Sequence, residues 1–420
     1  MDAFEIQGGK KLQGTIEVRG SKNAATPILA ATLLTRQTCV ISNIPLIEDV
    51  FRMLEIIESL GATVAWQGKR TVAVTARDID PSSIDPVLVK KLRSSLLLLG
   101  PLAARFDAFF LAQPGGCTIG KRPTDTHVDA FLKLGVSVEK TDKGYVVDAS
   151  ARKANSLVLR EMSVTGTENA MMLAASLPGK TVIKIAAAEP HVEDLGNFLR
   201  GMGAKIHGLG THTIEITGTK RLRGTSHRVI PDANEAATFL ILGAATGSLI
   251  TVKDAREGHL DLVLEKLREF GVGFSLTRNA ITVIPAKRLR AVRQVDTRVY
   301  PGIPTDIQAP LTVLATQAEG ETFIFDTLYE GRFNHAYELE KMGAKVLPLN
   351  PHQVMVIGPT PLRGTEIRSF DLRAGAALII AALCAKGTTI IDEAYQVDRG
   401  YEKIEERLRK LGADIRRITR

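Results

Sequence analysis

The stretch DRGYEKIEERLRKLGADI, residues 398–415, contains one copy of a pattern that recurs along the whole chain. Its apolar residues recur at three- and four-residue spacing, which predicts an amphipathic helix ending at Gly412, followed by a strand. The phrase Leu-Gly-Ala-x-Val within it recurs in similar form six times, with its glycine at Gly61, Gly135, Gly203, Gly271, Gly343 and Gly412. The intervals of 74, 68, 68, 72 and 69 residues are nearly equal. A regular internal repeat therefore organises the whole chain.

Each repeat carries the same sequence of patterns. A small-residue apolar stretch such as DLRAGAALIIAALCA (from Asp371) predicts a buried helix, and a β-branched stretch such as TTIIDE (from Thr388) predicts a strand. The amphipathic helix comes next, and two short alternating strands follow the glycine. The predicted unit is therefore βαβαββ, about 70 residues long, in an α/β protein.

The last repeat is cut short after Gly412, and its missing part is found at the other terminus. Phe4–Thr15 (FEIQGGKKLQGT) aligns with Ile214–Thr225 (IEITGTKRLRGT), so we expect the N-terminal strands to complete the sixth unit. Three units make a domain of ordinary size. We therefore expect two domains, residues 22–230 and residues 231–420 plus 1–21, with a ligand cleft between them. A solenoid is the alternative, but its terminal repeats would not be closed by the opposite end of the chain.

Composition narrows the class of protein. With 45% hydrophobic and 24% charged residues the chain is globular, and its apolar stretches are too short to span a membrane. The stretch MDAFEIQGGKK (from Met1) has no apolar h-region, so we expect no secretory signal. The three cysteines argue against a disulfide framework, and the eight histidines show no ligand spacing. We therefore expect a cytoplasmic protein without metal or cofactor; its oligomeric state is left open. The net charge of +8 without a basic tract, and the single Trp, favour a small polyanionic substrate over nucleic acid.

Charged residues recur where the helices of the repeats are expected to begin. Helix N-termini offer free N–H groups and a positive dipole end, and they bind phosphate and carboxylate readily. The acidic and amide residues at these starts are Asn23, Asp125, Glu168, Asn169, Glu189, Asp232, Glu235, Asp306 and Asp371. The basic residues are Lys22, Arg93, Arg122, Arg332, Arg373 and Arg399. Any one of them alone would be read as a surface residue, but their recurrence predicts a site that surrounds an anionic substrate.

Cys117 differs from the other two cysteines. It lies in AQPGGCTIGKRPTD among Gly115, Gly116 and Gly120, and the following Lys121 and Arg122 would favour the thiolate. Cys39 and Cys384 lie in apolar stretches and are expected to be buried and inert. Cys117 is therefore the candidate reactive thiol.

Six stretches resemble one known family: GSKNAA (from Gly20), PGGCTIGKRPTDTH (from Pro114), PTDIQA (from Pro304), EGRFNH (from Glu330), DLRAGA (from Asp371) and DRGYEKIEERLRKLGA (from Asp398). They are similar to the enolpyruvyl transferase family, and within it to the UDP-N-acetylglucosamine 1-carboxyvinyltransferases of peptidoglycan synthesis. The resemblance spans the full chain. It implies two "inside-out" α/β domains of three βαβαββ repeats each, and enolpyruvyl transfer from phosphoenolpyruvate to the 3-hydroxyl of UDP-N-acetylglucosamine with release of phosphate. It also implies a role in cell-wall biogenesis, cell shape and the cell division cycle, and a target for fosfomycin.

The resemblance also implies residue roles. Cys117 would be the general acid and Asp306 the base, with Lys22 and Arg399 stabilising charge during catalysis. Phosphoenolpyruvate would be bound by Lys22, Asn23, Arg122, Arg332, Arg373 and Arg399. UDP-N-acetylglucosamine would be bound by Arg93, Arg122, Pro123, Thr124, Asp125, Thr126, Ser163, Val164, Asp306 and Leu328.

The chain departs from the family pattern in several places. Glu161 stands where some members have Lys, Thr165 where Gly is usual, and Gly331 where Asn is usual. PDANEAATF (from Pro231) replaces PDRIEAGTF, and AAEPH (Ala187–His191) replaces AREPE. These changes concern substrate affinity more than reaction class.

Two alternatives to this function stay open. The first is 5-enolpyruvylshikimate-3-phosphate synthase, which typically has SKS where this chain has SKN (from Ser21) and lacks the cysteine loop. The second is a sugar-nucleotide-binding protein without turnover, which the joint presence of Cys117, Asp306 and Lys22 disfavours.

Overall fold

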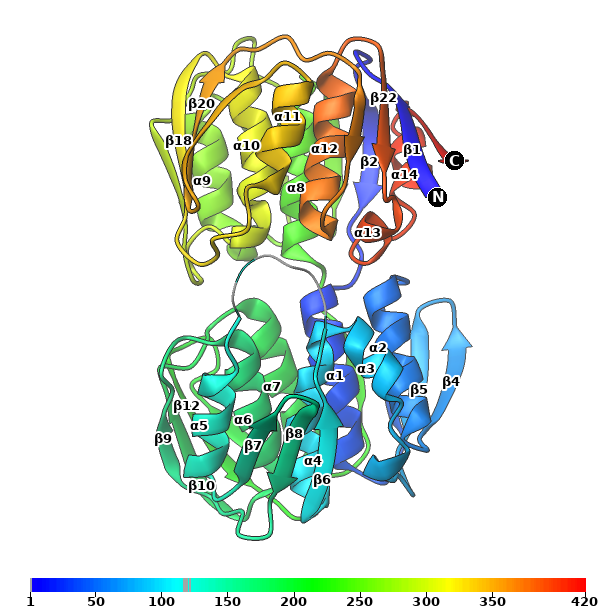
Figure 1. The fold of residues 1–420 in the computed structure, drawn as a ribbon, viewed down its shortest axis with the longest axis vertical. Helices are drawn as coiled ribbons and strands as arrows, with labels where there is room; N and C mark the ends of the chain where they lie inside the picture. The colour runs from blue at the N-terminus through cyan, green and yellow to red at the C-terminus, as the bar shows by residue number, and fades with distance from the viewer. Residues whose placement is uncertain (1, 116–119, 121) are drawn as a thin grey trace. The chain divides into compact units, whose positions relative to one another are not determined.

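The computed structural model describes residues 2–115, 120 and 122–420, so Cys117 and Lys121 lie outside the described residues. The chain divides into two compact units (Figure 1). We call residues 20–115 and 122–230 the first unit, and residues 2–19 and 231–420 the second unit. Both units are built on the same plan of central helices and outer sheets.

Helices made almost wholly of buried residues form the centre of each unit. In the second unit these are α8 (Ala233–Ala245), α10 (Gln308–Gln317) and α12 (Leu372–Cys384), which contact one another. Figure 1 shows them side by side, with strands on both flanks. In the first unit the central helices are α1 (Lys22–Ala31), α6 (Val164–Ser176) and α4 (Leu99–Arg105), the last preceded by the 3₁₀ helix η3 (Arg93–Leu98). A helix that is apolar on every side must be covered on every side, which explains this inside-out arrangement.

In the described part of the chain, six small sheets cover these helices. In the first unit, the first sheet has the strand order β13 (Ser226–Arg228), β3 (Cys39–Ser42), β5 (Thr71–Thr75), β4 (Thr63–Gly68). The second has the order β9 (Ser156–Val158), β10 (Gly179–Lys184), β12 (Thr213–Gly218), β11 (Lys205–His207). The third has the order β6 (Ala108–Ala112), β8 (Gly144–Asp148), β7 (Ser137–Thr141). In the second unit, the first sheet has the strand order β2 (Gln13–Glu17), β14 (Leu249–Lys253), β16 (Ala280–Ile284), β15 (Gly273–Thr277). The second has the order β17 (Gln294–Thr297), β18 (Gly320–Asp326), β20 (Gln353–Gly358), β19 (Lys345–Asn350). The third has the order β21 (Glu366–Arg368), β22 (Thr388–Asp392), β1 (Asp2–Gln7), β23 (Asp414–Thr419).

The outer helices complete the repeats. In the first unit they are α2 (Glu48–Ser59), α3 (Pro86–Lys91), α5 (Asp125–Lys133) and α7 (Pro190–Met202). In the second unit they are α9 (Asp261–Glu269), α11 (Asn334–Lys341), α13 (Tyr395–Asp398) and α14 (Ile404–Arg409). Short 3₁₀ turns are η1 (Thr32–Leu34), η2 (Pro81–Ser83), η4 (Glu257–His259) and η5 (Thr305–Ile307).

The six repeated glycines all have positive φ angles, between +77° and +114°. This left-handed conformation ends the amphipathic helix of each repeat and turns the chain into the next strand, and a residue with a Cβ adopts it only with strain. The glycine recurs in the sequence because every repeat needs this left-handed turn at the same place. The predicted fold class, an α/β protein of repeated βαβαββ units, is confirmed.

The two N-terminal strands do not act as the sequence analysis expected. β1 does join the sixth repeat, pairing antiparallel with β22 and β23. β2, however, pairs in parallel with β14 in the sheet of the fourth repeat, so the expectation that both strands complete the sixth unit is wrong. Every four-stranded sheet has one such parallel edge strand, and β13 supplies the corresponding one to β3 of the first unit. The edge strand of one unit therefore leads directly into the first central helix of the other.

Candidate active site

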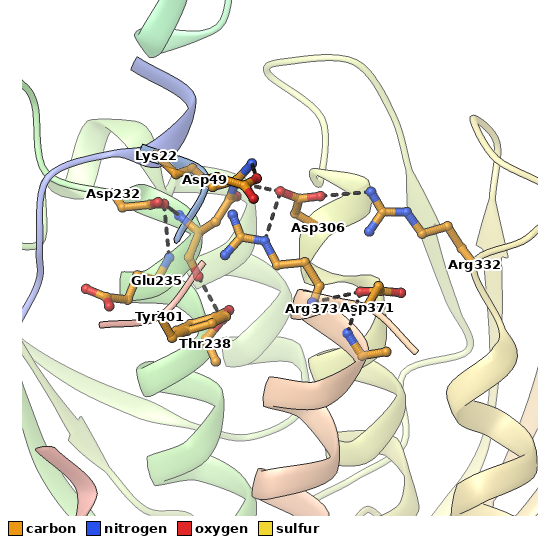
Figure 2. Close-up of polar contacts among 12 residues, drawn as sticks. Lys22, Asp49, Asp232, Glu235, Thr238, Asp306, Arg332, Asp371, Arg373 and Tyr401 are labelled. Atoms are coloured by element: carbon orange, nitrogen blue, oxygen red, sulfur yellow. Dashed lines mark hydrogen bonds and ion pairs between the residues drawn. The ribbon is translucent and has the colours of Figure 1, made fainter. Parts of the chain in front are cut away.

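Asp306 is the centre of a cluster of charged side chains in the second unit (Figure 2). It lies in η5, just before α10. Its Oδ1 accepts a hydrogen bond from Arg332 Nη2 at 2.9 Å, and its Oδ2 accepts one from Arg373 Nε at 3.0 Å. Two of the sequence-predicted arginines therefore contact the sequence-predicted base.

Local structure explains why these side chains meet. Arg373 is the second residue of α12, whose N-cap Asp371 accepts hydrogen bonds from the N–H groups of Arg373 and Ala374 at 2.7 and 2.9 Å. Asp326 at the end of β18 is fully buried and holds η5 in place, because Thr305 Oγ1 donates to its Oδ2 at 2.5 Å.

The two arginines remain charged in this setting. Burial alone would lower the pKa of the Arg332 guanidinium, but the carboxylates of Asp306, Asp371 and Asp326 raise it overall. Burial has the same effect on Arg373, whose pKa is nevertheless held well above its usual range by Tyr401, Asp306 and Asp232. The Arg373 guanidinium carbon also lies 5.3 Å from the centre of the Tyr401 ring, within range of a cation–π interaction.

Several donors of this cluster are buried without a hydrogen bond in the described part of the structure: both Nη atoms of Arg373 and Nε of Arg332. The Arg373 side chain is only 2% exposed. A buried donor without an acceptor is costly, so these groups fit an anionic ligand that accepts from a guanidinium fork. A carboxylate or a phosphate matches this donor geometry.

In the first unit, the predicted anion ligands lie at the starts of helices. Lys22 is the first residue of α1, and its Nζ pairs with Asp49 Oδ2 of α2 at 3.0 Å, in a largely buried ion pair. Asn23 is the next residue of α1. The Ser21 side chain caps this helix by accepting from the N–H of Ala24.

A second group gathers around the N-termini of α5 and α6. Arg122 and Pro123 precede α5, Thr124 is its N-cap, and Asp125 and Thr126 begin it. Arg93 donates to the Arg122 carbonyl at 2.7 Å, and Thr126 Oγ1 donates to Glu161 Oε1 at 3.0 Å. Ser163 is the N-cap of α6 and Val164 its first residue. The predicted UDP-sugar residues of this unit thus lie on two adjacent helix starts, where free N–H groups attract phosphate.

His127 supports these two helix starts from inside. Asn169 Oδ1 accepts from the Gly100 N–H at 2.8 Å, which leaves Asn169 Nδ2 to donate to His127 Nδ1 at 3.0 Å. The proton of neutral His127 is therefore on Nε2, which donates to Thr165 Oγ1 at 3.0 Å. Burial lowers the pKa of His127 to about 3, with a smaller contribution from Arg93.

This histidine predicts a pH dependence of stability. Between pH 6.5 and about 3, His127 is protonated in the unfolded chain but stays neutral in the folded protein. The free energy of unfolding therefore falls as the pH falls through this window. We expect His127→Gln to reduce that loss by up to about 5 kcal/mol, at ~1.4 kcal/mol per unit of pKa shift. Urea unfolding at a series of pH values measures it. The exposed His207→Gln serves as control, and an unchanged slope in His127→Gln would contradict the assignment.

Some predicted placements are wrong. Glu168 and Asn169 do not lie at a helix start, because α6 begins at Val164 and both residues are buried in its second turn. Arg399 is not at a helix N-terminus either: it is the C-cap of the four-residue α13, and its Nη1 donates to Gln396 Oε1 at 3.2 Å.

Two other predicted site residues remain to be placed. Leu328 lies two residues after Asp326, whose Oδ1 accepts the Leu328 N–H at 3.0 Å. The proposed general acid, Cys117, lies outside the described residues.

The structure adds residues that sequence reasoning missed. Asp49 pairs with Lys22, Asp326 orders the turn beside Asp306, and Asn234 Nδ2 donates to Asp306 Oδ2 at 3.2 Å. The departure PDANEA from the family motif was a visible signal for Asn234, but nothing in the sequence connected it with Asp306. Tyr401, in the GYE part of the last motif, is fully buried and hydrogen-bonded to Thr238 at 2.9 Å.

The described residues contain neither a cluster suited to a metal ion nor a helix suited to crossing a membrane. Across residues 2–115, 120 and 122–420, no cluster of three or more His, Cys, Asp or Glu side chains could hold a metal ion. In the same part of the chain, no helix has the length and apolarity to cross a membrane.

Comparison with known proteins gives consistent matches. Residues 6–408 match the family described as EPSP synthase (3-phosphoshikimate 1-carboxyvinyltransferase). The UDP-N-acetylglucosamine 1-carboxyvinyltransferase of Koribacter versatilis is 42% identical over 100% of this chain and 97% of the relative, and that of Helicobacter pylori is 40% identical over 100% and 99%. The crystal structure of the enolpyruvyl transferase NikO from Streptomyces tendae aligns with a TM-score of 0.90 and 28% identity, covering 100% of this chain and 99% of that one. EPSP synthase from Acinetobacter baumannii, at 20% identity and a TM-score of 0.74 over both full chains, shares the fold.

Proposed function

The chain belongs to the enolpyruvyl transferase family, and on that premise we propose that it transfers the enolpyruvyl group of phosphoenolpyruvate to the 3-hydroxyl of UDP-N-acetylglucosamine. The products are enolpyruvyl-UDP-N-acetylglucosamine and phosphate. Relatives of about 42% identity over the whole chain are named for this reaction, which favours it over transfer to shikimate 3-phosphate. The same proposal places the protein in the cytoplasm and in peptidoglycan precursor synthesis, hence in cell-wall growth and division.

The reaction needs an acid, a base and cationic groups. Cys117 donates a proton to the methylene carbon of phosphoenolpyruvate, while Asp306 takes the proton of the sugar 3-hydroxyl as its oxygen forms a bond to C2. The resulting tetrahedral ketal then loses a proton from the new methyl group and expels phosphate, which restores the double bond. Lys22, Arg122 and Arg399 bind the phosphate and stabilise the charge that leaves with it.

The observation that carries this proposal is the state of Arg373. Its guanidinium is buried, remains charged, donates one hydrogen bond to Asp306, and keeps two Nη atoms without an acceptor in the described part of the structure. We assign these donors, with those of Arg332, to the carboxylate of phosphoenolpyruvate. The same arginines then orient the electrophile beside the base, because both contact Asp306.

The helix starts of the first unit support the second half of the proposal. We assign the backbone and side chains from Arg122 to Thr126, together with Arg93, Ser163 and Val164, to the UDP-sugar, and from the second unit we add Asp306 and Leu328. Helix N-termini of this kind are ordinary sites for a diphosphate. Glu161 accepts from Thr126 Oγ1, so this departure from the family pattern places a carboxylate beside one of the two helix starts.

A phosphate-release assay tests the function. The protein is incubated with phosphoenolpyruvate and either UDP-N-acetylglucosamine or shikimate 3-phosphate, and free phosphate is measured. We expect release with UDP-N-acetylglucosamine alone. Release only with shikimate 3-phosphate would assign the protein to the other branch of the family, and binding of the UDP-sugar without release would make it a binding protein.

Cysteine labelling tests the general acid. Burial raises the pKa of the Cys39 thiol, and it raises that of Cys384 to about 12, so neither forms thiolate near neutral pH. An epoxide such as fosfomycin is therefore expected to alkylate Cys117 and leave the other two unmodified, as peptide mass mapping would show. Cys117→Ala should lose most turnover, whereas Cys117→Asp, which retains an acidic proton, should keep part of it and resist the epoxide. An adduct on Cys39 or Cys384 would contradict this assignment.

A further inference from the structure

Asn234 contacts the candidate base through a side chain that the common family motif lacks. Its Nδ2 lies 3.2 Å from Asp306 Oδ2, the same oxygen that accepts from Arg373 Nε. In PDRIEAGTF, the motif this chain resembles, the corresponding residue is Ile, which has no donor. The amide nitrogen must face the carboxylate, since the amide oxygen there would put two acceptors in contact without a proton.

The backbone of Asn234 is fixed from three sides. Its N–H donates to the N-cap Asp232 at 2.8 Å, and its carbonyl accepts from Thr238 Oγ1 at 2.8 Å. The neighbouring Glu235 is buried and accepts from Arg407 Nη1 at 2.5 Å and from the Arg19 N–H at 2.7 Å. The local bonds thus order the first turn of α8, and those of Glu235 hold this turn to Arg407 of α14 and to Arg19.

Asn234, Arg332 and Arg373, which all donate to Asp306 in the second unit, differ in what else they do. Arg332 and Arg373 are the groups that we assign to the carboxylate of phosphoenolpyruvate, so a bound substrate competes with Asp306 for them. Asn234 is neutral and has no charge to draw it toward an anionic substrate. A hydrogen bond from a neutral amide to a carboxylate still favours the ionised form of the acid.

We propose that Asn234 is a positioning residue for Asp306: its amide keeps the carboxylate ionised and oriented while Arg332 and Arg373 engage the substrate. This inference rests on the proposed function, because it concerns the base of that reaction. In the second unit, the charged groups near Asp306 are Arg332 before α11, Arg373 and Asp371 at the start of α12, Asp232 at the start of α8, and Asp326 at the end of β18. All of them are unchanged by substitutions at Asn234.

The test is the pH profile of kcat/KM, measured by phosphate release. A base must be ionised, so activity falls on the acid side, and we define the acid limb as the pH of half-maximal kcat/KM on that side. Asn234→Leu removes the donor at similar size and is expected to move the acid limb up by about one pH unit. At a pH below the acid limb, kcat/KM of Asn234→Leu is then about tenfold lower than that of the wild type. On the plateau the two values agree within about threefold. The ionisable groups of the substrates titrate identically in every variant. A difference in the acid limb between variants therefore comes from a group of the protein.

Asn234→Asp provides a second variant, whose folding is checked by its thermal transition. An acidic residue in the first turn of a helix favours the helix dipole, which offsets part of the repulsion from Asp306 and should keep the variant folded. It nevertheless faces Asp306 with a like charge, so its acid limb should move further up, by about two pH units. Asn234→Gln retains an amide and should recover part of the wild-type profile. Gln317→Leu, at the far end of α10, removes an amide remote from Asp306 and serves as the matched control.

The possible outcomes are distinct. Acid limbs of Asn234→Leu and Asn234→Asp that coincide with the wild-type limb would overturn the proposal, as would a loss of kcat/KM that is equal at every pH. A wild-type protein without turnover of the two substrates would instead overturn the proposed function. Shifted limbs in an Asn234→Asp variant that still unfolds in one cooperative thermal transition would establish the positioning role.

Discussion

Asp306→Asn is expected to lower kcat by about 10²–10⁴-fold, the usual contribution of a general base. The asparagine keeps the size of the side chain and one oxygen for Arg332 or Arg373, but its amide cannot take a proton from the sugar hydroxyl. The two arginines, relieved of a competing carboxylate, should bind phosphoenolpyruvate at least as well as before. Steady-state kcat and KM, with the UDP-sugar Kd from calorimetry, separate these effects.

The matched control is Asp296→Asn in β17 of the same unit. Asp296 pairs with the exposed Arg298 at 3.3 Å, a surface ion pair that contributes at most about 1 kcal/mol, so its loss should leave kcat unchanged. Equal losses of kcat and of UDP-sugar binding in Asp306→Asn would assign Asp306 to binding and remove it from proton transfer.

Arg373→Lys is expected to lower kcat/KM for phosphoenolpyruvate by about 10²–10⁴-fold, mostly through KM. Lysine keeps the charge, but its single ammonium cannot donate to Asp306 and also present a two-nitrogen fork to a carboxylate. Each charge-assisted hydrogen bond lost contributes about 1.5–3 kcal/mol, and two are lost here. The Kd of UDP-N-acetylglucosamine should change far less, because Arg373 is not assigned to that substrate.

Arg368→Lys in β21 is the control for this substitution. Its guanidinium is 60% exposed and pairs with Glu393 at 3.0 Å, so the exchange should leave both kinetic constants unchanged. A KM for phosphoenolpyruvate that stays within about twofold of wild type in Arg373→Lys would show that the buried fork binds something else.

Much of the fold could be predicted because its signals are local. A helix ending at Gly412 and an apolar helix from Leu372 are encoded by residues three or four positions apart. The positive φ of Gly412, +95°, recurs at the matching glycine of every repeat because each of these glycines ends a helix. The start of α6 was misplaced for a local reason as well. Its N-cap Ser163 lies one turn before the polar pair Glu168 and Asn169, which looked like a helix start but are buried inside it.

The six-fold repeat, the α/β class and the charged candidates for the site follow from the sequence alone. The tertiary structure is needed to show which strand completes which sheet. β2 and β14 pair across more than two hundred residues, and nothing in so short an edge strand identifies its partner. The tertiary structure also decided the surroundings of Asp306. Arg373 and Asn234 are 67 and 72 residues from Asp306 in the chain, and they reach it only because three central helices begin at the same end of the second unit.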